Sequence, residues 1–71
     1  MDYLEQIADS LAKDVLDVEA ATGDEELVNN VMKTIGASST TLEEAFLTAV
    51  RIRRAEGRAR ALIERHRRGA K

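Results

Sequence analysis

Residues 40–68 read TTLEEAFLTAVRIRRAEGRARALIERHRR, a stretch rich in strong helix formers, with no Pro and with Gly57 as its only Gly. The pair Thr40-Thr41 is followed three residues later by Glu43-Glu44, which is the spacing of a capping box. A helix over these residues would be about 40 Å long. The stretch therefore predicts a long C-terminal helix that starts near Thr40 and runs to about residue 68.

The apolar pattern of this helix changes midway along its length. The first half has a wide stripe, which favours packing against other helices: Leu42, Ala45, Phe46, Ala49 and Val50. The second half keeps a narrow apolar seam, typical of a coiled-coil contact: Ile52, Ala55, Ala59, Leu62 and Ile63. Arginines flank the seam, with Arg51, Arg54, Arg58 and Arg65 on one side and Arg53, Arg60 and Arg67 on the other.

Two shorter helices are expected before the long one. Residues 3–20 carry apolar side chains at helical spacing between Asp2 as N-cap and Thr22-Gly23 as stop: Leu4, Ile7, Leu11, Val15 and Val18. Residues 25–35 also carry apolar side chains at helical spacing, and Gly36 follows at the position of a left-handed C-terminal cap. These apolar residues are Leu27, Val28, Val31, Met32 and Ile35. We expect an all-α fold in one domain, residues 1–71, with both shorter helices packed on the long one and with Leu11 and Val31 buried.

The chain is too short to build a large core. With 71 residues it buries roughly 60% of the surface that its unfolded form exposes, and small folds usually need a disulfide, a metal or a partner chain. It has no Cys, and His66 is its only His, so no metal site and no cofactor are expected. We therefore expect a homodimer whose interface is the seam from Ile52 to Ile63.

Charge is divided between the two halves of the chain. Residues 1–44 hold 11 acidic and 2 basic side chains, net −9, whereas residues 45–71 hold 2 acidic and 9 basic ones, net +7. Three explanations remain open. Carboxylates of the first helix pair with guanidinium groups of the last, within or between chains; the Arg-rich helix binds an acidic partner or nucleic acid; or that helix is solvated and stabilised by its own Glu–Arg pairs.

One segment resembles a helix-turn-helix, the DNA-binding motif. The resemblance covers residues 28–48 and rests on Val31, Ile35, Gly36, Ala37 and Leu42. It departs from the motif at Met32, where a small residue is usual, and at Glu43-Glu44, which would face phosphates unfavourably. If the resemblance holds, the residues that contact nucleic acid or another acidic partner are Thr40, Thr41, Arg51, Arg54, Arg58, Arg65, Arg67 and Arg68.

Catalysis has little support in this sequence. The acidic pairs Glu25-Glu26 and Glu43-Glu44 lie at expected helix starts, and no Ser has a neighbouring base or a Gly-rich phosphate loop. No apolar run approaches the ~20 residues that cross a bilayer, and no signal peptide is recognisable. We expect a cytoplasmic, non-enzymatic interaction or regulatory protein that acts by binding, with a small DNA-binding regulator as the alternative.

Overall fold

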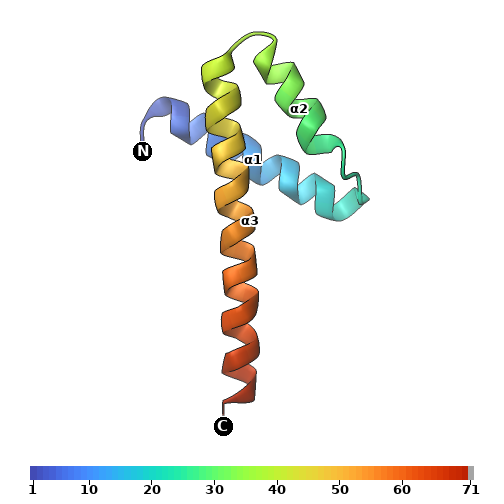
Figure 1. Cartoon of the computed structure of the whole chain (residues 1–71), viewed down its shortest axis with the longest axis vertical. Helices are drawn as coiled ribbons and strands as arrows, with labels where there is room; N and C mark the ends of the chain where they lie inside the picture. Colours follow the sequence, from blue (N-terminus) through green and yellow to red (C-terminus); the bar gives the residue numbers. More distant parts are fainter. Residues whose placement is uncertain (71) are drawn as a thin grey trace.

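The computed structural model describes residues 1–70 of the chain, which form three helices (Figure 1). They are α1 (Tyr3–Thr22), α2 (Leu27–Gly36) and α3 (Thr40–Gly69). α1 crosses the first half of α3, and α2 lies beside the same half and also contacts α1. The all-α arrangement, with two shorter helices packed on a long C-terminal helix, is confirmed.

α1 starts and stops where the sequence indicates. A carboxylate oxygen of Asp2 accepts a hydrogen bond from the backbone N–H of Glu5 at 2.8 Å, which caps the first turn. Gly23 ends the helix in the left-handed region, at φ 75°, and its N–H donates to the carbonyl of Glu19 at 2.8 Å. Both caps fix the length of the helix that crosses α3.

α3 has a different N-cap from the one expected. The hydroxyl of Ser39 accepts a hydrogen bond from the backbone N–H of Leu42 at 3.1 Å, so Ser39 is the cap. The capping box predicted from Thr40-Thr41 is wrong, because the helix is capped one residue earlier and Leu42, not a Glu, stands three positions on.

The left-handed cap predicted at Gly36 is also wrong. Among residues 1–70 only Gly23 has a positive φ, and α2 ends instead with the N–H of Ser39 donating to the carbonyl of Ile35 at 2.8 Å. Gly36 instead lies close to the side chain of Glu43. A Cβ at this position would run into the carboxylate of Glu43 on the first turn of α3.

These two glycines should respond differently to replacement by Ala. Gly23→Ala should cost about 1–2 kcal/mol, because an L side chain is strained at positive φ. Gly36→Ala should be neutral or stabilising by up to about 1 kcal/mol, since Ala favours a helix and the carboxylate of Glu43 can swing away. Urea unfolding followed by far-UV circular dichroism measures both. Equal losses would contradict the assignment of different roles.

The core lies where the three helices meet. Phe46 and Val50 are the largest side chains that are fully buried within residues 1–70, and the buried residues of this range number six: Ala8, Ala12, Val15, Val28, Phe46 and Val50. Leu11 and Val31, expected in the centre of the core, are only partly buried at its edge, and Val18 is 48% exposed. For Leu11 and Val18 the reason is that α1 meets α3 through Ala8 and Ala12, whose small side chains allow the two backbones to approach closely.

The second half of α3 projects from this packed region as a stalk, residues 55–69 (Figure 1). The molecule measures 52 × 29 × 13 Å, and every stalk residue except Glu64 is exposed. α1 reaches only the base of the stalk, where Lys13, Leu16 and Gly57 line a shallow depression. No helix within residues 1–70 has both the length and the apolar character needed to cross a membrane.

Candidate interaction surface

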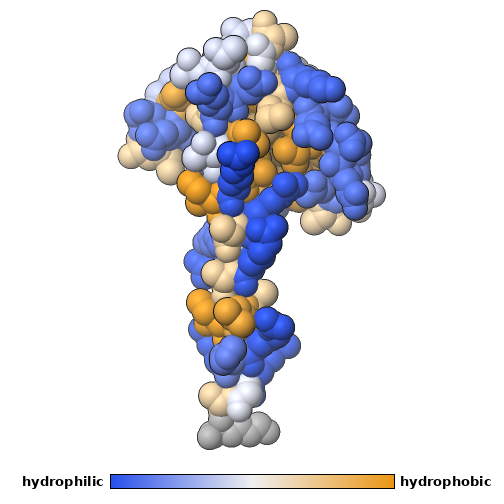
Figure 2. Space-filling model, viewed as in Figure 1, coloured by the Kyte–Doolittle hydropathy of each residue, from blue (hydrophilic) through white to orange (hydrophobic). Residues whose placement is uncertain are grey.

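The seam predicted on α3 is a continuous exposed strip. Ile52, Leu62 and Ile63 are 62%, 48% and 54% exposed, and Ala55 and Ala59 between them are also exposed. Figure 2 shows apolar side chains along the stalk with hydrophilic ones beside them. Since α1 and α2 pack elsewhere on α3, nothing within residues 1–70 covers this strip.

Gly57, the one Gly inside the long helix, is not part of the seam. It lies in the depression at the base of the stalk, together with Lys13 and Leu16 of α1. The reason is its register, because position 57 is about half a turn away from the line through Ala55, Ala59 and Leu62. Small residues in the seam are therefore limited to Ala55 and Ala59.

Two arginines of α3 form ion pairs with carboxylates of α1. Arg53 donates from Nε and Nη2 to the two carboxylate oxygens of Asp9, both at 2.8 Å, and the side chains are only 30% and 36% exposed. Arg54 donates to Glu19 at 3.1 Å. α1 carboxylates thus neutralise part of the Arg-rich helix within the chain, which was one of the three explanations left open.

The Asp9–Arg53 pair should stabilise the fold only above acidic pH. Its hydrogen bonds, assisted by the charge of Arg53, lower the pKa of Asp9 from the ordinary value of 3.8, and they raise the pKa of Arg53. Because the folded pKa of Asp9 lies below the unfolded one, the stabilisation is complete above about pH 5 and is lost as the pH falls through the folded pKa.

Asp9→Asn should therefore lower the melting temperature by a few degrees at pH 7, and the difference from the parent should shrink toward pH 3. Asp17→Asn is the matched control, since its partner Lys13 is a neighbour on α1 and both side chains are more than half exposed. Melting curves across pH measure both variants. An effect of Asp9→Asn that does not change with pH would contradict this role of the ion pair.

The remaining arginines of α3 fall into two groups. Arg60 pairs with Glu56 at 2.9 Å, and Arg67 and Arg68 lie 3.2 and 3.7 Å from Glu64, so these three belong to the exposed Glu–Arg ladder of the stalk. Arg51, Arg58 and Arg65 form no ion pair within residues 1–70. They recur every seven residues and so line one edge of the seam; we call them the arginine row.

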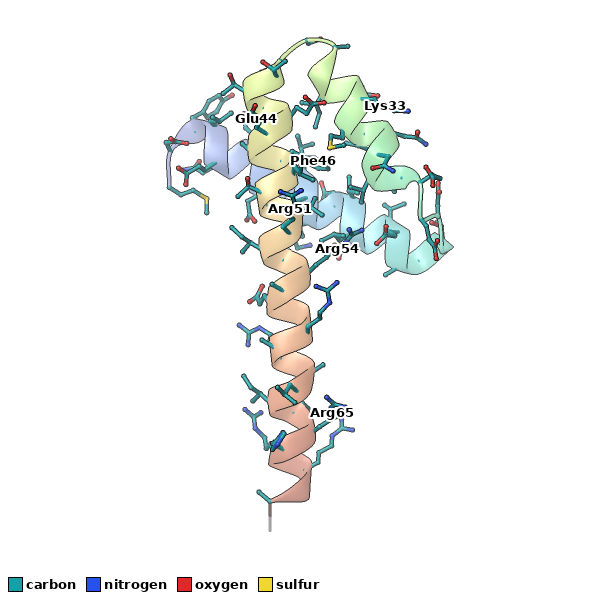
Figure 3. All side chains as sticks on the ribbon, in the orientation of Figure 1. Lys33, Glu44, Phe46, Arg51, Arg54 and Arg65 are labelled. Carbon is teal, nitrogen blue, oxygen red and sulfur yellow. The ribbon has the colours of Figure 1, made fainter. Side chains whose placement is uncertain are left out.

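Figure 3 places the members of this row that it labels. Arg51 lies at the level where α1 crosses α3, near Arg54, whereas Arg65 lies far along the stalk and away from both shorter helices. The row therefore runs from the packed region out along the projecting helix. Its guanidinium groups are available to a partner.

The residues of the helix-turn-helix resemblance lie at the opposite end of α3 from the basic tip. Thr40 and Thr41 are exposed in its first turn, and the exposed Glu44 follows on the next turn (Figure 3). Arg65 is 25 residues after Thr40, about 38 Å along a helix. The structure thus does not bring the threonines and the basic tip together into one cluster.

Sequence reasoning missed a groove between the N-terminal half of α1 and the first half of α3. It has a volume of about 320 Å³ and is lined mainly by Glu5, Ala8 and Asp9 of α1 and by Ala45, Ala49 and Ile52 of α3. Ile52 belongs to both the groove and the seam, so the two surfaces are continuous. The groove depends on the angle at which α1 crosses α3, which no local pattern specifies.

No group of three or more His, Cys, Asp or Glu side chains within residues 1–70 is arranged to hold a metal ion. Comparison of the chain with protein-family models, curated proteins and solved structures finds no match. The exposed seam, the arginine row and the groove are the candidate binding surfaces of the described residues.

Proposed function

We propose that this chain is a helical interaction or regulatory protein that acts by binding and that it self-associates through the seam of α3. The observation that carries the proposal is the exposure of Ile52, Leu62 and Ile63 on one continuous face of a helix that projects beyond its neighbours. Leaving such a strip in water forgoes burial worth about 25 cal/mol per Å² of apolar surface. A second copy of the chain offers an identical strip, and symmetric dimers are the commonest protein assemblies.

The size of the core supports the same proposal. Only six of residues 1–70 are buried in the single chain, and the largest of them is Phe46. A core this thin gains from any apolar surface that a partner covers, because association adds to the stability of the folded state. Of the six large apolar side chains that are exposed within residues 1–70, three lie on the seam, namely Ile52, Leu62 and Ile63.

Sedimentation equilibrium of the unaltered protein at tens of micromolar tests the proposal. We expect the mass of a dimer. Equilibrium sedimentation is preferable to gel filtration here, because a chain measuring 52 × 29 × 13 Å elutes early even as a monomer. A monomer mass over this concentration range would overturn self-association.

Nucleic-acid binding is a second candidate function, and the arginine row favours it. Arg51, Arg58 and Arg65 are unpaired within residues 1–70, and cations at regular spacing on an exposed helix can contact successive phosphates. The acidic residues near the turn, Glu43 and Glu44, count against base reading there. We therefore keep self-association as the leading proposal.

A duplex-DNA titration at two salt concentrations separates the candidates. Binding through several Arg side chains falls steeply with salt, whereas an apolar interface responds little. Replacing Thr40 and Thr41 should weaken binding to a preferred sequence more than to random duplex, while charge reversal at Arg65, Arg67 and Arg68 should weaken both alike. No binding to duplex at low salt would remove this candidate.

A further inference from the structure

We propose that the second copy binds antiparallel, so that the tip of each stalk lies along the groove between α1 and α3 of its partner. This inference rests on the proposed self-association and adds its direction and the residues that meet. In this arrangement the groove binds the C-terminal part of α3 of a second chain. Three features of the described residues carry it.

The first feature is that groove and seam form one strip. Ala45, Thr48 and Ile52 line the groove at helical spacing, and the same line continues through Ala55, Ala59 and Leu62 of the seam. A helix that packs on the seam and continues toward the N-terminus of α3 therefore enters the groove. In an antiparallel pair that helix is the tip of the partner stalk.

The second feature is the order of large and small side chains. An antiparallel register centred at position 57 pairs Ile52 with the partner's Leu62 and Ala55 with the partner's Ala59. Small residues then meet in the middle, where they allow the helices to approach closely, and large ones meet at both ends. Ile63 points toward the edge that, in the partner, carries Ala49 and the groove.

The third feature is charge. A parallel dimer would place two acidic halves, each net −9, at one end and two basic halves, each net +7, at the other. The antiparallel dimer places each basic tip beside an acidic first half. Glu5, which lines the groove and forms no ion pair within residues 1–70, is then within reach of the partner's Arg67.

The arginine row opposes this arrangement on the other edge of the seam. In the antiparallel register Arg58 lies near the partner's Arg58, and Arg51 lies near the partner's Arg65. Like charges at these positions repel, and salt screens the repulsion.

An equimolar mixture of the parent with Arg58→Glu should therefore form mixed dimers in clear excess over the half that random pairing of the chains gives. A parallel dimer gives no such preference, because Arg58 would face the partner's Ile63.

Disulfide trapping tests the direction directly, since the chain has no Cys. Ile52→Cys and Leu62→Cys alter exposed side chains, and circular dichroism checks that both variants fold. In the antiparallel dimer, position 52 lies beside the partner's position 62, but about 15 Å along the axis from the partner's position 52. A disulfide needs Cα atoms within about 7 Å, so the two pairings are readily distinguished.

We expect an equimolar mixture of tagged Ile52→Cys and untagged Leu62→Cys to form the mixed disulfide in large excess, about tenfold or more, over the Ile52→Cys homodimer. Peptide mapping identifies which positions are joined. A dominant Ile52→Cys homodimer, or a dimer that forms no mixed disulfide, would overturn the antiparallel arrangement and leave self-association standing. A monomer in sedimentation would instead remove the proposed function.

Discussion

Phe46→Ala should unfold most of the protein at room temperature or bring it close to unfolding. Phe46 is fully buried where α3 meets α1 and α2, and it has the largest side chain of the buried core (Figure 3). Truncating a buried Phe to Ala costs about 3–5 kcal/mol. A domain of this length is stable by about 4–10 kcal/mol, so this one change removes a large part of its stability.

Tyr3→Ala is the matched control, because Tyr3 and Phe46 are the only aromatic residues of the chain. Tyr3 is 77% exposed at the start of α1, and its truncation should leave the melting temperature nearly unchanged. Far-UV circular dichroism follows both variants, since the Tyr3 variant loses the chain's only strong chromophore at longer wavelength. If Phe46→Ala melts within a degree or two of the parent, the described core is wrong.

The three helices were predictable because their signals are local. Asp2 caps α1, Gly23 stops it, and the long run after Ser39 contains no Pro and only Gly57 as a weak helix former in its interior. These signals act within a few residues of one another, which is the range over which a sequence pattern is informative. The turn between α2 and α3 was less predictable, since Ser39, Thr40 and Thr41 are all acceptable N-caps.

The buried face of α1 was predicted less well, and the reason is the way it crosses α3. The spacing of large apolar side chains predicted that Leu11 is buried and that Val18 lies on the same face, but α1 contacts α3 through Ala8 and Ala12. Small residues are buried wherever two helix backbones lie close together. How close the backbones lie depends on the way the two helices pack, which neither sequence segment specifies alone. The same crossing angle creates the groove.

The candidate site was likewise predictable only where its features depend on local sequence. The spacing of Ile52, Ala55 and Leu62 specifies a face of one helix, so the seam was visible in the sequence. Which arginines are already neutralised was not, because Asp9 and Arg53 are 44 residues apart and meet only through the crossing of α1 and α3. The arginine row emerges as a separate group once that pairing is known.

Leu62→Glu combined with Ile63→Glu should convert the dimer into a folded monomer. Both side chains are about half exposed in the single chain, so charge at these positions costs the monomer little. The new carboxylates would also lie one turn from Arg58 and Arg67, which favours the helix. In the dimer the same carboxylates would be buried without a designed partner, at a cost of about 3 kcal/mol or more, a weakening on the order of 100-fold.

Ala21→Glu combined with Ala61→Glu is the control, because it adds the same charge at exposed positions of α1 and α3 that lie off the seam. Sedimentation equilibrium should give a dimer for the control and a monomer for the seam variant, with similar helix content by circular dichroism. If the seam variant dimerises as tightly as the control, the copies meet through another surface. Because the seam residues contribute nothing to the buried core, loss of the dimer with retained helicity assigns them to the interface rather than to the fold.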